Sequence, residues 1–188
     1  MWKRVSDWVH RISTGWAALA ALIIFLLFTA LVLPGQASRA EASTGNGDSP
    51  DMSFYYTADD LYQMAEGYGE EGRRAYVRAR FTFDLIWPLV YTIFLATGIS
   101  WLTRQAFAPG SRWQLINLAP ILAALFDYLE NVSTSLVMIR YPSSTAVVDV
   151  LAPLFTMIKW SLVSGSFVLL LVSGAAGAWR WVGSRKQK

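Results

Sequence analysis

The sequence contains no cysteine and only one histidine among its 188 residues. The lack of cysteine excludes disulfides, thiolate metal sites and cysteine nucleophiles. The single histidine, His10, excludes a haem that is held by two histidines of the same chain. Charged residues make up 15% of the chain, against about 25% in soluble domains. No catalytic triad, metal-ligand cluster or phosphate-binding loop can be recognised, so the sequence favours a protein that is not an enzyme and indicates no cofactor or metal.

The sequence has four long apolar runs, which account for its low content of charged residues. The shortest has 18 residues, or about 27 Å as an α-helix, and a hydrocarbon core of about 30 Å needs about 20. Polar and apolar residues do not alternate in these runs, which argues against a membrane β-barrel. The sequence therefore predicts an all-α fold, an integral membrane four-helix bundle in a single domain over residues 1–188. The predicted spans are 16–33, 81–102, 115–139 and 150–172.

The N-terminal region resembles a signal peptide in its basic start and its apolar centre. A secretory signal has an apolar core of about 7–15 residues, and this core is longer. We therefore expect residues 1–37 to act as an uncleaved signal anchor that forms the first span.

Basic residues are distributed unequally about the four runs, and this bias predicts the topology. One side carries nine of them: Lys3, Arg4, Arg11, Arg104, Arg112, Arg180, Arg185, Lys186 and Lys188. The other side carries six: Arg39, Arg73, Arg74, Arg78, Arg80 and Arg140. We expect a multi-pass protein of the cell inner (cytoplasmic) membrane with both termini in the cytoplasm. The same distribution explains the isoelectric point near 9.3 without a nucleic-acid partner.

The segment 34–80 is expected outside the cytoplasm, as a linker followed by an amphipathic helical hairpin. Pro34–Asp51 is rich in Ala, Ser and Gly, which predicts a flexible linker. Thr57 and Asp60 form a near capping box for a first helix, and a second helix is predicted from Glu70. Between them, residues 67–72 spell the G-x-G-x-x-G pattern. No strand precedes it, so we interpret it as a glycine hinge rather than a dinucleotide site.

Four arginines follow the hinge and form a predicted basic collar at the outer headgroups. They are Arg73, Arg74, Arg78 and Arg80. Long basic side chains near the ends of membrane helices commonly reach towards lipid phosphates. A dedicated anion site is the alternative.

The third apolar run contains a costly polar group at its centre. Asp127, Glu130 and Asn131 interrupt it, and a charged residue there costs roughly 2.5–3.5 kcal/mol on insertion scales. Lys159 lies at a matching depth in the fourth run, so we predict that it pairs with Asp127 or Glu130. Asp84 and Tyr91 share one face of the second run and complete the predicted intramembrane polar cluster.

One lysine cannot neutralise two carboxylates, so the second acid is expected to be protonated or hydrogen-bonded. Three interpretations remain open. The cluster could lock the helix register, as buried polar groups do elsewhere. It could form a pocket for a small ligand or a lipid headgroup. It could also be part of a proton or ion path.

A wider pattern extends from about Tyr56 to Trp160. Its letters are Tyr56-Thr57, Tyr68-Gly69, Gly72-Arg73, Tyr76, Asp84, Pro88, Tyr91, Phe126–Asn131, Tyr141-Pro142 and Lys159-Trp160. In these positions the chain resembles a group of small, uncharacterised prokaryotic four-span membrane proteins. The resemblance implies a membrane fold and brings no activity with it.

The sequence favours a non-catalytic integral membrane protein that is an accessory or structural subunit of a larger membrane assembly. Its expected partners are membrane lipids and other membrane protein subunits. The alternative is a small-molecule or lipid-binding protein, or an ion or proton transporter, that uses the intramembrane polar cluster.

Overall fold

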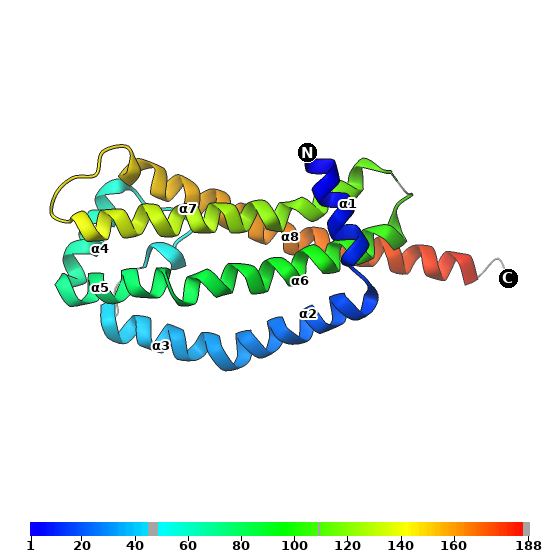
Figure 1. Cartoon of the computed structure of the whole chain (residues 1–188), viewed down its shortest axis with the longest axis horizontal. Helices are drawn as coiled ribbons and strands as arrows, with labels where there is room; N and C mark the ends of the chain where they lie inside the picture. The colour runs from blue at the N-terminus through cyan, green and yellow to red at the C-terminus, as the bar shows by residue number, and fades with distance from the viewer. Residues whose placement is uncertain (45–48, 109, 186–188) are drawn as a thin grey trace. The chain divides into compact units, whose positions relative to one another are not determined.

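The computed structural model describes residues 1–44, 49–108 and 110–185, apart from the side chains of 181, 184 and 185. These residues form helices and turns and contain no strand. Four helices are long and apolar enough to cross a membrane: Gly15–Thr44, Gly69–Ala106, Arg112–Arg140 and Val148–Arg180 (Figure 1). The predicted all-α fold and its four span-length helices are therefore confirmed.

The helices follow one another with short connections. In chain order they are α1 (Trp2–Ile12), α2 (Gly15–Leu27), the π-helical turn η1 (Phe28–Val32), α3 (Leu33–Thr44), the 3₁₀ turn η2 (Pro50–Met52), α4 (Ala58–Gly67), α5 (Gly69–Arg80), α6 (Phe83–Ala106), the 3₁₀ segment η3 (Arg112–Leu118), α7 (Ala119–Arg140) and α8 (Val148–Arg185).

The first long helix continues well past the end of its apolar run. Helices α2 and α3 join through η1, so helix persists to Thr44 where a flexible linker from Pro34 was predicted. That prediction is wrong for residues 34–44. Pro34 comes just after the π-helical turn η1, so the helix continues past the proline through a local π distortion, and alanines then favour the helix. Residues 45–48 of the predicted linker lie outside the described residues.

Helices α4 and α5 begin as their sequences indicate. Thr57 caps α4, because its hydroxyl accepts from the Asp60 amide at 3.1 Å while the Asp60 carboxylate accepts from the Thr57 amide at 2.8 Å. Gly69 then adopts φ +63° between the two helices, a conformation that suits glycine. The predicted glycine hinge is confirmed at this position.

The third and fourth long helices differ from their predicted limits. Residues Arg112–Leu118 form 3₁₀ turns, and the α-helix starts at Ala119, immediately before a proline that favours a first helical turn. Helix α8 extends beyond the predicted end at Val172 to Arg185. A short connection joins α6 to η3, and Pro109 within it lies outside the described residues.

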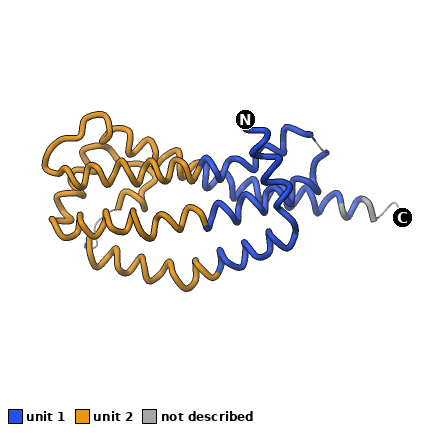
Figure 2. The backbone as a smooth tube through the Cα atoms, viewed as in Figure 1, with its two compact units in different colours: residues 1–26, 90–122, 162–188 blue, residues 27–89, 123–161 orange. Residues whose placement is uncertain are grey.

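The chain divides into two compact units (Figure 2). Unit 1 comprises residues 1–26, 90–122 and 162–188, and unit 2 comprises residues 27–89 and 123–161. The core of unit 2 contains eight buried residues: Tyr56, Leu61, Ala65, Tyr68, Tyr76, Val137, Met138 and Ala152. Helices α3 and α5 also approach closely in this unit, because a Cβ at Gly72 would lie 2.7 Å from the Ser43 carbonyl oxygen.

In unit 1, buried polar side chains join the short helix α1 to α6 and η3 by hydrogen bonds. Ser6 donates to Asn117 Oδ1 at 2.8 Å, and Asn117 donates to the Ser100 hydroxyl at 2.9 Å. His10 Nδ1 lies 3.2 Å from the Ser100 carbonyl and Nε2 lies 3.0 Å from that of Gln114. A neutral imidazole can donate to only one of these oxygens. The single histidine is thus a buried contact of α1.

Candidate functional site

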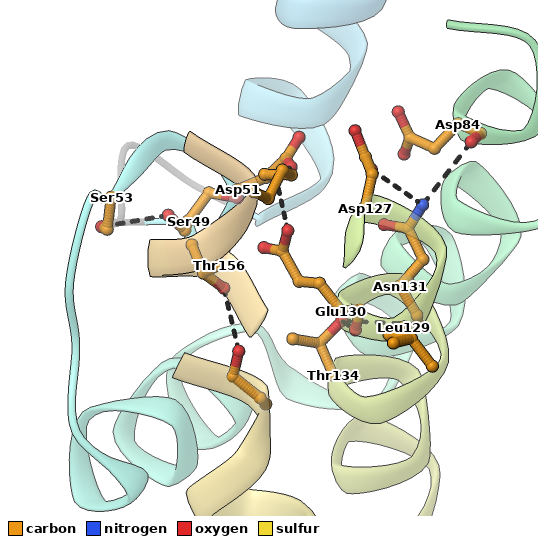
Figure 3. Close-up of polar contacts among 12 residues, drawn as sticks. Ser49, Asp51, Ser53, Asp84, Asp127, Leu129, Glu130, Asn131, Thr134 and Thr156 are labelled. Atoms are coloured by element: carbon orange, nitrogen blue, oxygen red, sulfur yellow. Dashed lines mark hydrogen bonds and ion pairs between the residues drawn. The ribbon is translucent and has the colours of Figure 1, made fainter. Parts of the chain in front are cut away.

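The polar centre predicted from the third run is a cluster in unit 2 that draws on five chain segments. Its members, called the charge cluster below, are Asp51 of η2, Arg80 of α5, Asp84 of α6, Asp127, Glu130 and Asn131 of α7, and Lys159 of α8. All of them except Asp51 are buried. In Figure 3 the Glu130 side chain points towards Asp51.

Lys159 is the cation at the meeting point of α7 and α8. Its Nζ lies 2.5 Å from Glu130 Oε2 and 2.7 Å from Asp51 Oδ1. The side chain of Lys159 is 4% exposed and that of Glu130 is 1% exposed. The predicted pairing of Lys159 with Asp127 or Glu130 is therefore confirmed for Glu130.

Arg80 supplies a second buried cation that the sequence analysis assigned to the basic collar. Its Nη1 lies 2.9 Å from Asp51 Oδ2 and 3.0 Å from Asp84 Oδ2, and its side chain is 8% exposed. The guanidinium also lies 4.5 Å from the centre of the Tyr76 ring. Arg80 therefore faces the protein interior and not lipid phosphates. Its spacing of four residues from Asp84 was the available signal for this pair.

Asp51 is the member that sequence reasoning missed. It lies in the polar stretch predicted as a linker, yet its two carboxylate oxygens bind Arg80 and Lys159. Burial alone raises the pKa of this carboxyl, but the two neighbouring cations outweigh burial and hold the pKa of Asp51 far below its usual range. Asp51 is thus an ionised bridge between α5 and α8.

Asn131 connects the remaining acids of the charge cluster. Its Nδ2 lies 3.4 Å from Asp127 Oδ1 and 3.5 Å from the Asp84 carbonyl oxygen, and Figure 3 shows it between the two. These are long contacts. Its Oδ1, like Glu130 Oε1, is buried without a hydrogen-bond partner among the described residues. Such atoms are costly in an apolar surrounding and mark a polar interior.

The charges of the cluster do not balance. Four carboxyl groups, those of Asp51, Asp84, Asp127 and Glu130, accompany the two cations Arg80 and Lys159. Two carboxyl groups are thus in excess of the cations. Within residues 1–44, 49–108 and 110–185, no group of three His, Asp or Glu side chains has the arrangement of a metal site.

The remaining predicted site residues are Tyr91 and three arginines of α5. Tyr91 belongs to unit 1 and is buried there. Arg73 donates to the Ala65 carbonyl at 2.9 Å and lies 4.7 Å from the centre of the Tyr141 ring. Arg74, an exposed residue, forms an ion pair with Glu70, and Arg78 is also exposed. Arg73 is half-buried, and the basic collar that these three arginines are predicted to form at the lipid headgroups stays a prediction.

No protein-family model matches this chain, and comparisons with curated proteins and with solved structures find no match.

Proposed function

We propose that the protein is a non-catalytic, multi-pass protein of the cytoplasmic membrane that serves as an accessory or structural subunit of a membrane assembly. Both termini lie in the cytoplasm, and residues 34–80 begin on the opposite side and lead into the second span. The proposal rests on the four apolar helices and the basic-residue bias. In this arrangement the charge cluster holds the segment around Asp51 onto the membrane helices.

The observation that carries this proposal is the set of ion pairs that members of the charge cluster form with one another. Arg80 and Lys159 each bind two carboxylates, and Asp51 joins them to each other. Of two cavities beside α5, the one of about 640 Å³ is lined by no member of the charge cluster, and the one of about 370 Å³ is lined by Arg80 but not by Asp127, Glu130 or Lys159. Ion pairs that join five chain segments favour a structural role over a binding role, and the buried oxygens of Glu130 and Asn131 that have no hydrogen-bond partner among the described residues are the part of the cluster that this role does not use.

An assembly partner is supported by the poor burial of the first long helix. In Gly15–Thr44, as in Val148–Arg180, only 11% of the most apolar window is buried, against 50% in Gly69–Ala106. Leu27 and Leu31 are 53% and 74% exposed. In a membrane such a surface contacts either lipid or another helix, and small differences in packing decide between them.

Native mass spectrometry of the protein extracted from its own membrane in mild detergent tests the assembly. We expect a complex with another chain in a fixed ratio. Changing Leu27 and Leu31 to alanine should dissociate it, whereas the same change at the exposed Leu85 and Ile86 of α6 should leave it intact. A bare monomer mass for the parent protein would contradict the proposal.

A second candidate is a cation- or proton-binding membrane protein, which the excess of two carboxyl groups favours. Intramembrane acids of this kind occur in proton relays. Asp127→Asn and Glu130→Gln separate the two functions, because they remove charge and preserve shape. A structural lock predicts that both variants stay folded and assembled and that the parent protein carries no flux in vesicles. Proton or cation flux by the parent, lost in folded variants, would instead establish the transport function.

A further inference from the structure

The surface arginines of α5 line a cavity that is separate from the charge cluster. The cavity has a volume of about 640 Å³, within the usual range for small-molecule sites. Arg73, Arg74 and Arg78 lie on its α5 side, and Ile139 and Tyr141 lie on the side of α7 and the loop that follows it. All these residues belong to unit 2.

The arginines are held to different degrees. Arg73 is oriented by its hydrogen bond to Ala65 and by the Tyr141 ring, and Arg74 pairs with Glu70. The exposed Arg78 guanidinium has no ion pair or side-chain hydrogen bond among the described residues. Three guanidinium groups against one carboxylate give the cavity an excess of positive charge. Guanidinium groups are particularly suited to phosphate, which they bind through paired hydrogen bonds.

The apolar wall of the cavity distinguishes a lipid from a free anion. Val77 and Ile139 line it beside the arginines, and Ile139 is 64% exposed. Ile139 is also the last residue of the third apolar run, and Arg140 follows as the last residue of α7. Positive charge therefore borders apolar surface at the end of a span-length helix. A phospholipid carries a matching pair of groups, because its anionic phosphate lies next to apolar acyl chains.

We propose that this cavity binds the headgroup phosphate of an anionic phospholipid, with the arginines on the phosphate and with Val77 and Ile139 against the upper acyl chain. Glu70 opposes an anion and sets a limit on affinity. The site goes beyond the assembly role proposed above. It requires a membrane location, but no partner subunit.

The test is a titration of the purified full chain in non-ionic detergent, read by native mass spectrometry. The probes are phosphatidylglycerol, phosphatidylcholine with the same acyl chains, and inorganic phosphate. We expect phosphatidylglycerol to bind at least fivefold more tightly than phosphatidylcholine. Arg78→Gln should weaken phosphatidylglycerol binding about fivefold, since one basic residue near an anionic membrane contributes about that factor.

Two further variants control for non-specific charge and for misfolding. Arg140→Gln removes an exposed arginine at the end of α7 that does not line the cavity, and it should leave binding unchanged. Glu70→Gln should tighten binding, an effect that a damaged fold cannot produce. Equal affinity for both lipids, or equal loss in Arg78→Gln and Arg140→Gln, would overturn the site. Competition by inorganic phosphate at lipid-like concentrations would assign it to free phosphate and overturn the lipid.

Discussion

Asp51 and Lys159 are 108 residues apart in the sequence, and their side chains are joined by a 2.7 Å contact between Asp51 Oδ1 and Lys159 Nζ. Each also has a second partner of opposite charge, Arg80 for Asp51 and Glu130 for Lys159. These pairs link η2, α5, α7 and α8. The strength of the charge cluster can therefore be measured by removing one member at a time.

Lys159→Met should destabilise the protein by about 3–5 kcal/mol, the usual cost of leaving a buried charge without its partner. Adding Glu130→Gln should recover most of this loss, because the Glu130 side chain is 1% exposed and has no other route to water. Adding Asp51→Asn should recover little, because Asp51 is 30% exposed and keeps Arg80. Unfolding in detergent, followed by circular dichroism, measures the three variants. Equal recovery in both double variants would contradict this order.

Asp51→Asn should release the segment that follows it. We expect backbone amides of Ser53–Tyr56 to exchange hydrogen about tenfold faster, the effect of losing a charge-assisted hydrogen bond. The control is Asp59→Asn, which removes an exposed acid from the first turn of the following helix α4 and should leave exchange of these amides unchanged. Hydrogen-exchange mass spectrometry resolves this region. Unchanged exchange in Asp51→Asn would mean that apolar contacts alone hold it.

The attachment of this segment should also depend on pH. The pKa of Asp51 is far lower in the folded protein than in an unfolded chain, where it is about 3.9. Its stabilising contribution is therefore fully present above about pH 4 and is lost progressively as the pH falls below that value. Exchange of the same amides, corrected for intrinsic rates, should rise below pH 4 in the parent protein and much less in Asp51→Asn. A parallel rise in both would contradict the assignment.

Gly72→Ala should destabilise the contact of α3 with α5 by about 1–3 kcal/mol, the usual cost of overpacking. The added Cβ would lie 2.7 Å from the Ser43 carbonyl oxygen, which belongs to the backbone and cannot rotate away. Gly67→Ala in α4 is the control, because nothing lies within 4 Å of its Cβ position. Thermal unfolding of both variants in one detergent makes the comparison. A loss in Gly67→Ala as large as in Gly72→Ala would remove the steric explanation.

The proposed topology predicts opposite labelling of two single-cysteine variants. The parent chain has no cysteine, so each variant carries one reactive thiol. Glu41→Cys, at an exposed position of α3, should react with an impermeant thiol reagent in whole cells. Lys3→Cys, at an exposed position of α1, should react only after the membrane is opened. The reverse pattern would invert the topology.

Several features could be predicted because they depend on local sequence. The four long helices could be predicted from apolar runs that are long enough to span a membrane. The spacing of Thr57 and Asp60 gave the cap of α4, and a glycine between two helical patterns gave the hinge at Gly69. Lys159 and Glu130 could be paired because position along two apolar runs fixes depth.

Other features depend on contacts that no local pattern reveals. Asp51 lies among serines and glycines, and its cationic partners are far away in the sequence. Ser6 binds Asn117 across 111 residues, whereas the basic character of the first residues suggested only a topology signal. The sequence does not distinguish Arg80 from the other arginines of α5, because only the structure shows that its side chain points into the protein and binds Asp84. The resemblance to small prokaryotic membrane proteins and the single-domain organisation remain predictions.

The distribution of the charge cluster along the chain imposes an order on biosynthesis. A ribosome makes Asp51 first, then Arg80 and Asp84, then Glu130, and Lys159 last. In the proposed membrane topology, Glu130 is therefore present before the cation that binds it. The fourth long helix brings that cation and so supplies the ion pair that Glu130 lacks until then. Nascent chains that stop short of Lys159 are the forms that insertion and quality-control machinery would encounter with this acid still unpaired.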